Sequence, residues 1–213
     1  MTEDRRRSPV VDPRSSVVRR PSDTREGGVL IRIGVTGHRV LAELEKINAG
    51  VEAALRRIEQ RFPGEAMTVI SALAEGADRI VAHHLLDRHG SGLIVPLPMP
   101  TSDYLDDFKS ASSRAEFLTL LQRAHQVEEM SSAATREQAY DAAGEYVLNN
   151  SDVLIAIWDG RNSQGQGGTG DVVARARERG LPIAWVHAGN REAGTDRPTS
   201  LGDEQGRVTF ENI

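Results

Sequence analysis

The sequence predicts an α/β protein, with a Rossmann-like, three-layer α/β/α fold and a mostly parallel sheet of about six to seven strands. Segments with the patterns of strands and helices alternate about six times between residues 29 and 188. Several strand-like segments are apolar at nearly every position, which is typical of parallel strands covered by helices on both faces. In such sheets ligands bind beyond the carboxyl ends of the strands, so functional residues are expected there.

The first predicted strand, residues 29–36, is an apolar run that ends at Gly37. Residues 44–62 have the apolar spacing of an amphipathic helix, which Pro63 and Gly64 terminate. Residues 101–109 are expected to form a polar loop. The other predicted strands are 67–71, 92–97, 125–128, 153–158 and 183–186, and the other predicted helices are 76–89, 113–123, 137–149 and 171–179.

Composition divides the chain into three parts. Residues 1–28 are predicted to be a disordered, arginine-rich leader, residues 29–188 a folded domain, and residues 189–213 a weakly ordered tail. The leader holds seven arginines and five acidic residues, and since the whole chain has a net charge of −5, the remainder carries −7. An acidic folded domain argues against nucleic acid as a partner, because broad contact with it usually needs a basic face.

Several classes of protein are excluded by what the sequence lacks. There is no cysteine, which rules out disulfides and thiolate metal sites and makes a reducing cytoplasm the expected location. No apolar run approaches the roughly 20 residues of a membrane span. The first arginines, residues 5–7, are not followed by the apolar stretch of a signal peptide, so none is expected. His84 and His89 lack the spacing of a zinc site, and the aspartates of residues 101–109 are expected to be solvated, so no metal is predicted.

The most informative motif is the glycine-rich turn at residues 165–171, between a predicted strand and a predicted helix. Glycines there let the backbone approach a ligand closely, and the first turn of the helix presents free N–H groups to it. Those donors and the helix dipole favour an anion, above all a phosphate. The residues expected to form this phosphate site are Gly167, Gly168, Thr169, Gly170 and Asp171.

Residues 165–170 also match the dinucleotide-binding pattern G-x-G-x-x-G. That pattern belongs after the first strand of its fold, whereas here it follows a late strand, so NAD chemistry is not expected. No Gly-Lys-Ser/Thr follows it, which excludes a P-loop. No glycine-flanked elbow surrounds Ser71, which argues against a serine triad. The expected ligand is a nucleotide or a nucleotide derivative, with no further cofactor.

Polar residues also follow the first predicted strand, at Thr36, Gly37, His38 and Arg39. Gly37 permits a sharp turn, Thr36 offers a hydroxyl group, and Arg39 offers a forked cation suited to phosphate. Asp159 follows the strand at residues 153–158 and is a candidate for binding ribose hydroxyls.

The second predicted strand is followed by Ser71, Glu75 and Gly76, which are further candidates for the same pocket. Gly76 allows the start of the next helix to approach a ligand or the first strand. Glu75 either accepts a hydrogen bond from a ribose hydroxyl or simply suits a helix N-terminus. Asp78 and Arg79 are expected on the surface of that helix.

These three strand ends together resemble the SLOG superfamily, a Rossmann-like group that includes the LOG cytokinin-activating enzymes, DNA-processing protein A and the sensor domains of TRPM channels. The similarity covers roughly residues 29–188. The matching segments are residues 33–39, 71–78, 150–160 and 167–171. The resemblance implies a nucleotide pocket, a homodimer or higher oligomer, and a sensor role in bacterial signalling or anti-phage defence, with an effector encoded separately.

LOG enzymes cleave the N-glycosidic bond of nucleoside monophosphates with the motif P-G-G-x-G-T-x-x-E. In this chain the threonine and glutamate positions of that motif are Asp171 and Ala174. A carboxylate would stabilise the cationic transition state, so its loss favours ligand binding over hydrolysis. The alternative, a phosphoribohydrolase with an altered carboxylate, would use Glu75 or Asp171, and the catalytic residue stays open between them.

Overall fold

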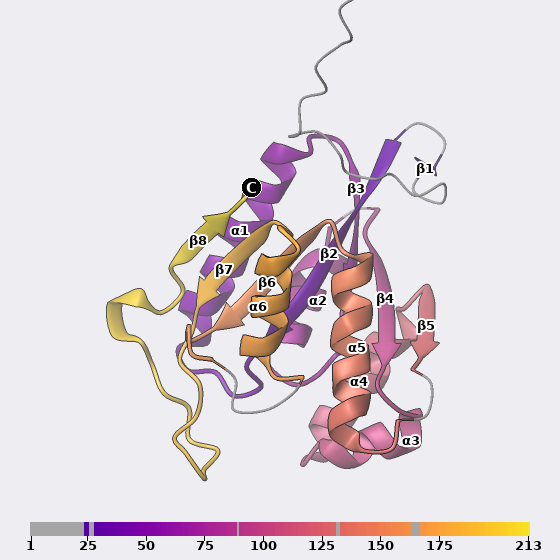
Figure 1. Cartoon of the computed structure of the whole chain (residues 1–213), viewed down its shortest axis with the longest axis vertical. Coiled ribbons are helices and arrows are strands. Elements are labelled where there is room, and N and C mark those ends of the chain that lie inside the picture. The colour runs from indigo at the N-terminus through magenta and orange to yellow at the C-terminus, as the bar shows by residue number, and fades with distance from the viewer. Residues whose placement is uncertain (1–23, 26–27, 89, 131–132, 163–166) are drawn as a thin grey trace, which may run out of the picture.

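The computed structural model describes residues 24–25, 28–88, 90–130, 133–162 and 167–213. It confirms the predicted α/β class, with strands and helices alternating along the chain (Figure 1). The strands are β1 (Thr24–Arg25), β2 (Gly28–Gly37), β3 (Ala66–Ile70), β4 (Gly92–Leu97), β5 (Gln126–Glu129), β6 (Val153–Trp158), β7 (Ile183–His187) and β8 (Val208–Glu211). The helices are α1 (Leu44–Arg61), α2 (Ala77–Leu86), α3 (Thr101–Tyr104), α4 (Ala111–Gln122), α5 (Arg136–Asn150) and α6 (Thr169–Glu178), with 3-10 turns η1 (Leu105–Asp107) and η2 (Gly202–Glu204).

The strands form a mostly parallel sheet in the order β5-β4-β3-β2-β6-β7-β8, and β1 pairs with β2 in antiparallel fashion. All neighbours from β5 to β7 are parallel, and β8 runs antiparallel to β7. The chain builds outward from β2 to β5, then places β6 on the other side of β2 and continues to β7. This reversal between β2 and β6 is the topological switch point, where ligands bind in doubly wound folds.

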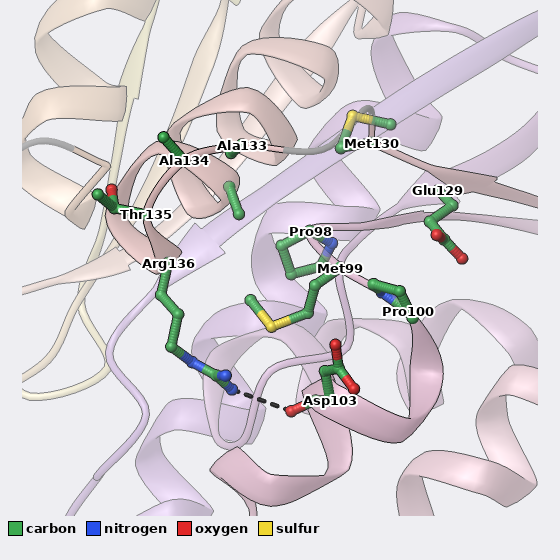
Figure 2. A pocket seen from close by; sticks show the side chains of 11 residues that line it. Pro98, Met99, Pro100, Asp103, Glu129, Met130, Ala133, Ala134, Thr135 and Arg136 are labelled. Atoms are coloured by element: carbon green, nitrogen blue, oxygen red, sulfur yellow. Dashed lines mark hydrogen bonds between the residues drawn. The ribbon is translucent and has the colours of Figure 1, made fainter.

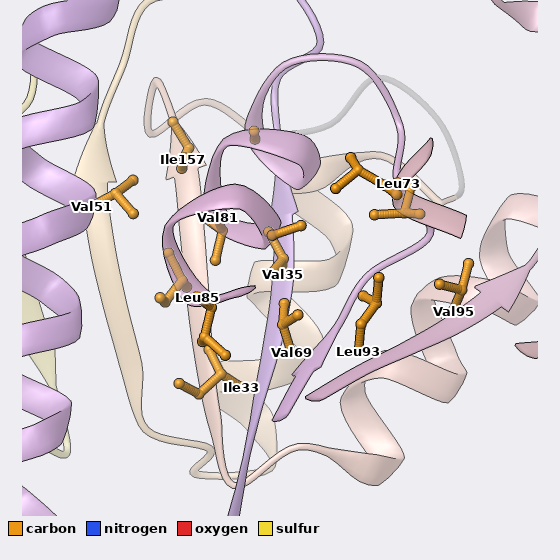
Figure 3. Packing of buried hydrophobic residues seen from close by; sticks show 14 of the residues in the cluster. Ile33, Val35, Val51, Val69, Leu73, Val81, Leu85, Leu93, Val95 and Ile157 are labelled. Carbon is orange, nitrogen blue, oxygen red and sulfur yellow. The ribbon is translucent and has the colours of Figure 1, made fainter. Parts of the chain in front are cut away.

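Helices cover both faces of the sheet, as strands without a polar face require. Helices α1 and α2 pack on one face, and α5 and α6 lie in front of the other face in Figure 1. Ile33 and Val35 of β2 enter the core beneath α1 and α2 (Figure 3), whereas Gly34 lies against α5. The 6 residues of β6 are all buried, which explains the unbroken apolar run in the sequence.

The segment predicted as a polar loop, residues 101–109, instead contains α3 and η1. Tyr104 and Phe108 are buried there and pack edge-on at a centroid distance of 5.1 Å. Both rings also contact Phe117 of α4, at 5.5 and 5.0 Å. The four-residue spacing of the two aromatic residues puts them on one side of a helical turn. The free energy gained by burying both rings is larger than the preference of the aspartates between them for a solvated loop.

Residues 189–213, expected to be a weakly ordered tail, add η2 and the edge strand β8 to the domain. Gln205 is 4% exposed and anchors this segment. Its side chain accepts hydrogen bonds from the backbone of Gly189 and Leu201 and donates one to the carbonyl group of Ala42. These partners are distant in sequence, so the polar composition of the segment does not reveal them.

The predicted leader lies mostly outside the described residues. The part that is described, Thr24 and Arg25, pairs with the first residues of β2. Among the helices in the described ranges, none combines the length and the hydropathy that a membrane span requires.

Candidate functional site

The carboxyl ends of β2 and β6 are joined by the side chain of His38, which directly follows β2. Its Nε2 atom accepts a hydrogen bond from the backbone N–H of Asp159, which follows β6, at 3.1 Å. One Asp159 carboxylate oxygen lies 3.3 Å from the same atom. Burial lowers the pKa of His38, and this outweighs the opposite effect of Asp159. In the neutral ring the proton is therefore on Nδ1, and His38 links the two strands at the switch point.

Two of the predicted glycines allow close packing at this edge of the sheet. A β carbon on Gly37 would lie 2.6 Å from the carbonyl oxygen of Ile157 in β6. Gly76, the N-cap of α2, lies against the carbonyl groups of His38 and Arg39. The first N–H of α2 already donates to the His38 carbonyl oxygen at 3.1 Å. The N-terminus of α2 is therefore occupied by the protein itself.

Arg39 places an exposed positive charge at the same edge. Its guanidinium carbon lies 5.4 Å from the centre of the Tyr140 ring of α5, a cation–π contact. The ring is held by a hydrogen bond from its hydroxyl group to the Asp107 carboxylate. Within the described ranges the Arg39 side chain forms no ion pair or hydrogen bond. The guanidinium group is therefore oriented by the ring and has no counter-ion among the described residues, as the binding of an anion requires.

The start of α6 supplies backbone donors beyond the end of β6. Gly168 is the N-cap residue, and its carbonyl oxygen accepts the N–H groups of Asp171 and Val172 at 3.0 and 3.1 Å. The N–H groups of Thr169 and Gly170 have no acceptor among the residues that the structure describes. Two free donors at a helix N-terminus are suited to a phosphate. The first two residues of the predicted motif, 165 and 166, lie outside the described residues.

Both carboxylates considered for catalysis are bound by protein groups. Asp171 accepts the N–H of Gly167 at 3.3 Å and pairs with Arg175, one helical turn later, at 3.1 Å. Glu75 accepts a hydrogen bond from the hydroxyl group of Ser113 in α4. Both carboxylates therefore already have protein partners, and neither is placed to act as a general acid or base.

Thr36 and Ser71 have different surroundings, although the sequence pattern predicts one pocket for both. Thr36 is half-buried in β2 and pairs with Ala156 of β6, next to the switch point. Ser71 is fully buried; its hydroxyl group donates to Asp78 at 2.8 Å and accepts the N–H of Leu73 at 3.0 Å. Ser71 therefore holds the turn between β3 and α2 together.

The expectation that Asp78 and Arg79 lie on the helix surface is wrong, because they are only 7% and 3% exposed. Arg79 donates from Nε to the carbonyl group of Leu73 at 3.0 Å and from Nη1 to Glu116 at 2.9 Å. A signal for Asp78 was present in the sequence, since it precedes Val81 by three positions and so shares the buried face of α2. The pairing of Arg79 with α4 depends on a contact that the local pattern does not encode.

The buried carboxyl group makes stability depend on pH. Burial raises the pKa of Asp78 to about 6, although the hydrogen bonds from Ser71 and Ala74 act in the opposite direction. A folded-state pKa above the unfolded value of about 4 means that the folded protein binds this proton more tightly. The contribution of the protonated Asp78 side chain to the free energy of unfolding is therefore complete below about pH 4 and is lost as the pH rises through about 6.

We therefore expect the wild type to lose about 2 kcal/mol more stability than Asp78→Asn between about pH 4.5 and 7.5. Urea unfolding of both proteins across this range measures the difference. His38, whose pKa is lowered, acts in the opposite sense, losing its stabilisation as the pH falls, but it is present in both proteins and cancels. Parallel stability curves for the two proteins would exclude Asp78 as the titrating group.

No metal centre is evident within the described ranges, where no three or more His, Cys, Asp or Glu side chains form a group that could hold an ion. Comparison with known proteins adds no assignment: no protein-family model matches the chain, and no curated protein matches it. The candidate site is thus defined by geometry, with Arg39 and Asp159 at the ends of β2 and β6 and free N–H groups at the start of α6.

Proposed function

We propose that this chain is a nucleotide-binding domain of the SLOG kind that acts as a ligand sensor. The observation that carries the proposal is the pairing of two anion-binding elements at one switch point. The guanidinium group of Arg39 follows β2, and the N–H groups of Thr169 and Gly170 follow the adjacent strand β6; within the described ranges none of them has a hydrogen-bond or ion-pair partner of its own. A phosphate at this position would meet a helix N-terminus and a forked cation at once. Asp159, beside His38, is the proposed acceptor for ribose hydroxyls.

A sensor role is favoured over the hydrolysis of an N-glycosidic bond. Hydrolysis would need a carboxylate free to stabilise the developing positive charge on the sugar. The hydrogen bonds and ion pair of Glu75 and Asp171 argue against either residue in that role. Incubation with a panel of nucleotides, followed by chromatography for free base, tests this choice. Release of base that stops in Asp171→Asn would replace the sensor with a phosphoribohydrolase.

In calorimetric titrations with nucleoside mono- and diphosphates, Arg39→Ala is expected to weaken binding about tenfold, the effect of one lost charge-assisted contact. Gly168→Val is expected to abolish measurable binding, because it adds a branched side chain to the N-cap residue that directly precedes the N–H donors of Thr169 and Gly170. The backbone of Gly168 is extended, with φ −79° and ψ 162°, a conformation that valine adopts readily. The melting temperature of both variants should therefore stay close to that of the wild type.

Arg57→Ala is the matched control, because Arg57 is also exposed and lies on α1, away from the switch point. It should leave nucleotide affinity unchanged. Equal affinity of Arg39→Ala, Gly168→Val and the wild type would remove the basis of the proposal. The proposal further includes self-association and a separately encoded effector, which light scattering and co-expression with neighbouring genes would test.

A further inference from the structure

A cavity of about 440 Å³ opens beyond the carboxyl ends of β4 and β5, beside the start of α5 (Figure 2). Its size lies within the range of small-molecule sites. Much of its lining is apolar, with Pro98 and Met99 after β4 and Met130 after β5. Proline rings and thioether groups provide flat, polarizable surfaces against which an aromatic ring packs well.

The polar lining of the cavity favours a hydrogen-bond donor over a phosphate. Arg136 is the cation in the lining, and its charge is compensated by Asp107 at 2.5 Å. It also donates to the carbonyl group of Asp103 at 2.9 Å, as Figure 2 shows. The Glu129 carboxylate, by contrast, forms no ion pair or hydrogen bond within the described part of the chain. Asp103 also lines the cavity, and within the described residues its carboxylate accepts only the Ser102 hydroxyl group, so the charges left without a counter-ion here are carboxylates, whose natural partner is an amine.

The cavity and the switch point are connected through α5. Arg136 of α5 lines the cavity. Tyr140 lies one helical turn later, and the centre of its ring is 5.4 Å from the guanidinium carbon of Arg39. Strand β3 separates β2 from β4, so at about 4.8 Å per strand spacing the ends of β2 and β4 lie of the order of 10 Å apart. A nucleoside monophosphate has comparable reach between its phosphate and the far edge of its base.

We propose that this cavity receives the base of the nucleotide whose phosphate binds at Arg39 and α6, and that Glu129 selects a purine with an exocyclic amine. This inference rests on the proposed function and adds the class of base. The apolar lining packs against the ring, the Glu129 carboxylate accepts the amine, and the phosphate stays at the switch point.

The test compares adenosine monophosphate, inosine monophosphate and ribose 5-phosphate by calorimetry. Adenosine and inosine monophosphates differ in the amine, and ribose 5-phosphate lacks a base. We expect the wild type to prefer adenosine over inosine monophosphate about tenfold, and Glu129→Ala to abolish this preference. Ala134→Trp, an exposed substitution in the cavity lining, should weaken adenosine monophosphate binding at least about tenfold and leave ribose 5-phosphate binding within about twofold.

Ala115→Trp, at an exposed position of α4, controls for the added indole group and should change none of the three affinities. If Ala134→Trp binds adenosine monophosphate as the wild type does, the base lies elsewhere, and the inference fails while the phosphate site stands. Equal affinity of the wild type for the two nucleotides would overturn the role of Glu129. If none of the three compounds binds the wild type, the proposed function fails, and this inference fails with it.

Discussion

Replacing Gly76 with alanine should lower the free energy of unfolding by about 3–5 kcal/mol, because the added methyl group meets both backbone strain and a steric clash. Gly76 has φ 76° and ψ −117°, which a residue with a side chain adopts only under strain. A β carbon there would also lie 2.5 Å from the carbonyl oxygens of both His38 and Arg39. Since these are backbone atoms, relief requires moving β2 away from α2.

Gly64→Ala separates backbone strain from the steric clash. Gly64 also has a positive φ, 78°, but a β carbon added there would meet no atom within 4 Å. This control should cost about 1–2 kcal/mol, the strain of the backbone alone. Urea unfolding of both variants gives the comparison. Equal losses would mean that the contact between α2 and the end of β2 is not tightly packed.

Arg79→Ala is expected to destabilise the protein by about 3 kcal/mol or more. Its side chain is 4% exposed, packs 4.6 Å over the ring of Phe108, and binds the carbonyl groups of Leu73 and Ser113. Truncation would leave the buried carbonyl group of Leu73 without this donor, remove the link to Ser113 in α4, and open a void beside the ring. Arg79→Lys should recover part of the loss, since it keeps the charge but not the forked geometry.

The control for Arg79 is Arg197→Ala, which removes an ion pair with Glu192 between side chains that are 76% and 47% exposed. An exposed pair of this kind contributes at most about 1 kcal/mol. Denaturant unfolding of Arg79→Ala, Arg79→Lys and Arg197→Ala provides the measurement. A loss for Arg79→Ala no greater than for Arg197→Ala would show that the contacts with α4 do not stabilise the fold.

Much of the sheet was predictable because a strand buried on both faces is apolar at nearly every position, a pattern that is visible in the sequence itself. The apolar run of β6 and the glycine at the end of β2 need no distant partner to be recognised. The short strand at residues 125–128 was also predicted, and β5 covers Gln126–Glu129. Residues 101–109 were mistaken for a solvated loop because the aspartates masked the spacing of Tyr104 and Phe108.

The candidate site was predictable in position but not in detail. The glycine-rich turn and the residues after the first strand each carry a recognisable chemistry, and parallel strands place such ends on one edge of the sheet. The roles of single residues were not visible: Ser71 binds Asp78, and His38 binds Asp159. Tyr140, whose ring contacts the Arg39 guanidinium group, was missed because it lies on a helix about a hundred residues further along the chain.

The sequence by itself determined the α/β class, the alternation of elements and the edge of the sheet where polar groups gather, because periodicity and turn chemistry depend on neighbours in the chain. Only the tertiary structure decided that β6 lies beside β2, so that Arg39 and the start of α6 share one switch point. It also decided that Arg79 is buried against α4 and that residues 208–211 complete the sheet. These outcomes depend on the order of strands and on pairs of residues far apart in sequence, which no local pattern records.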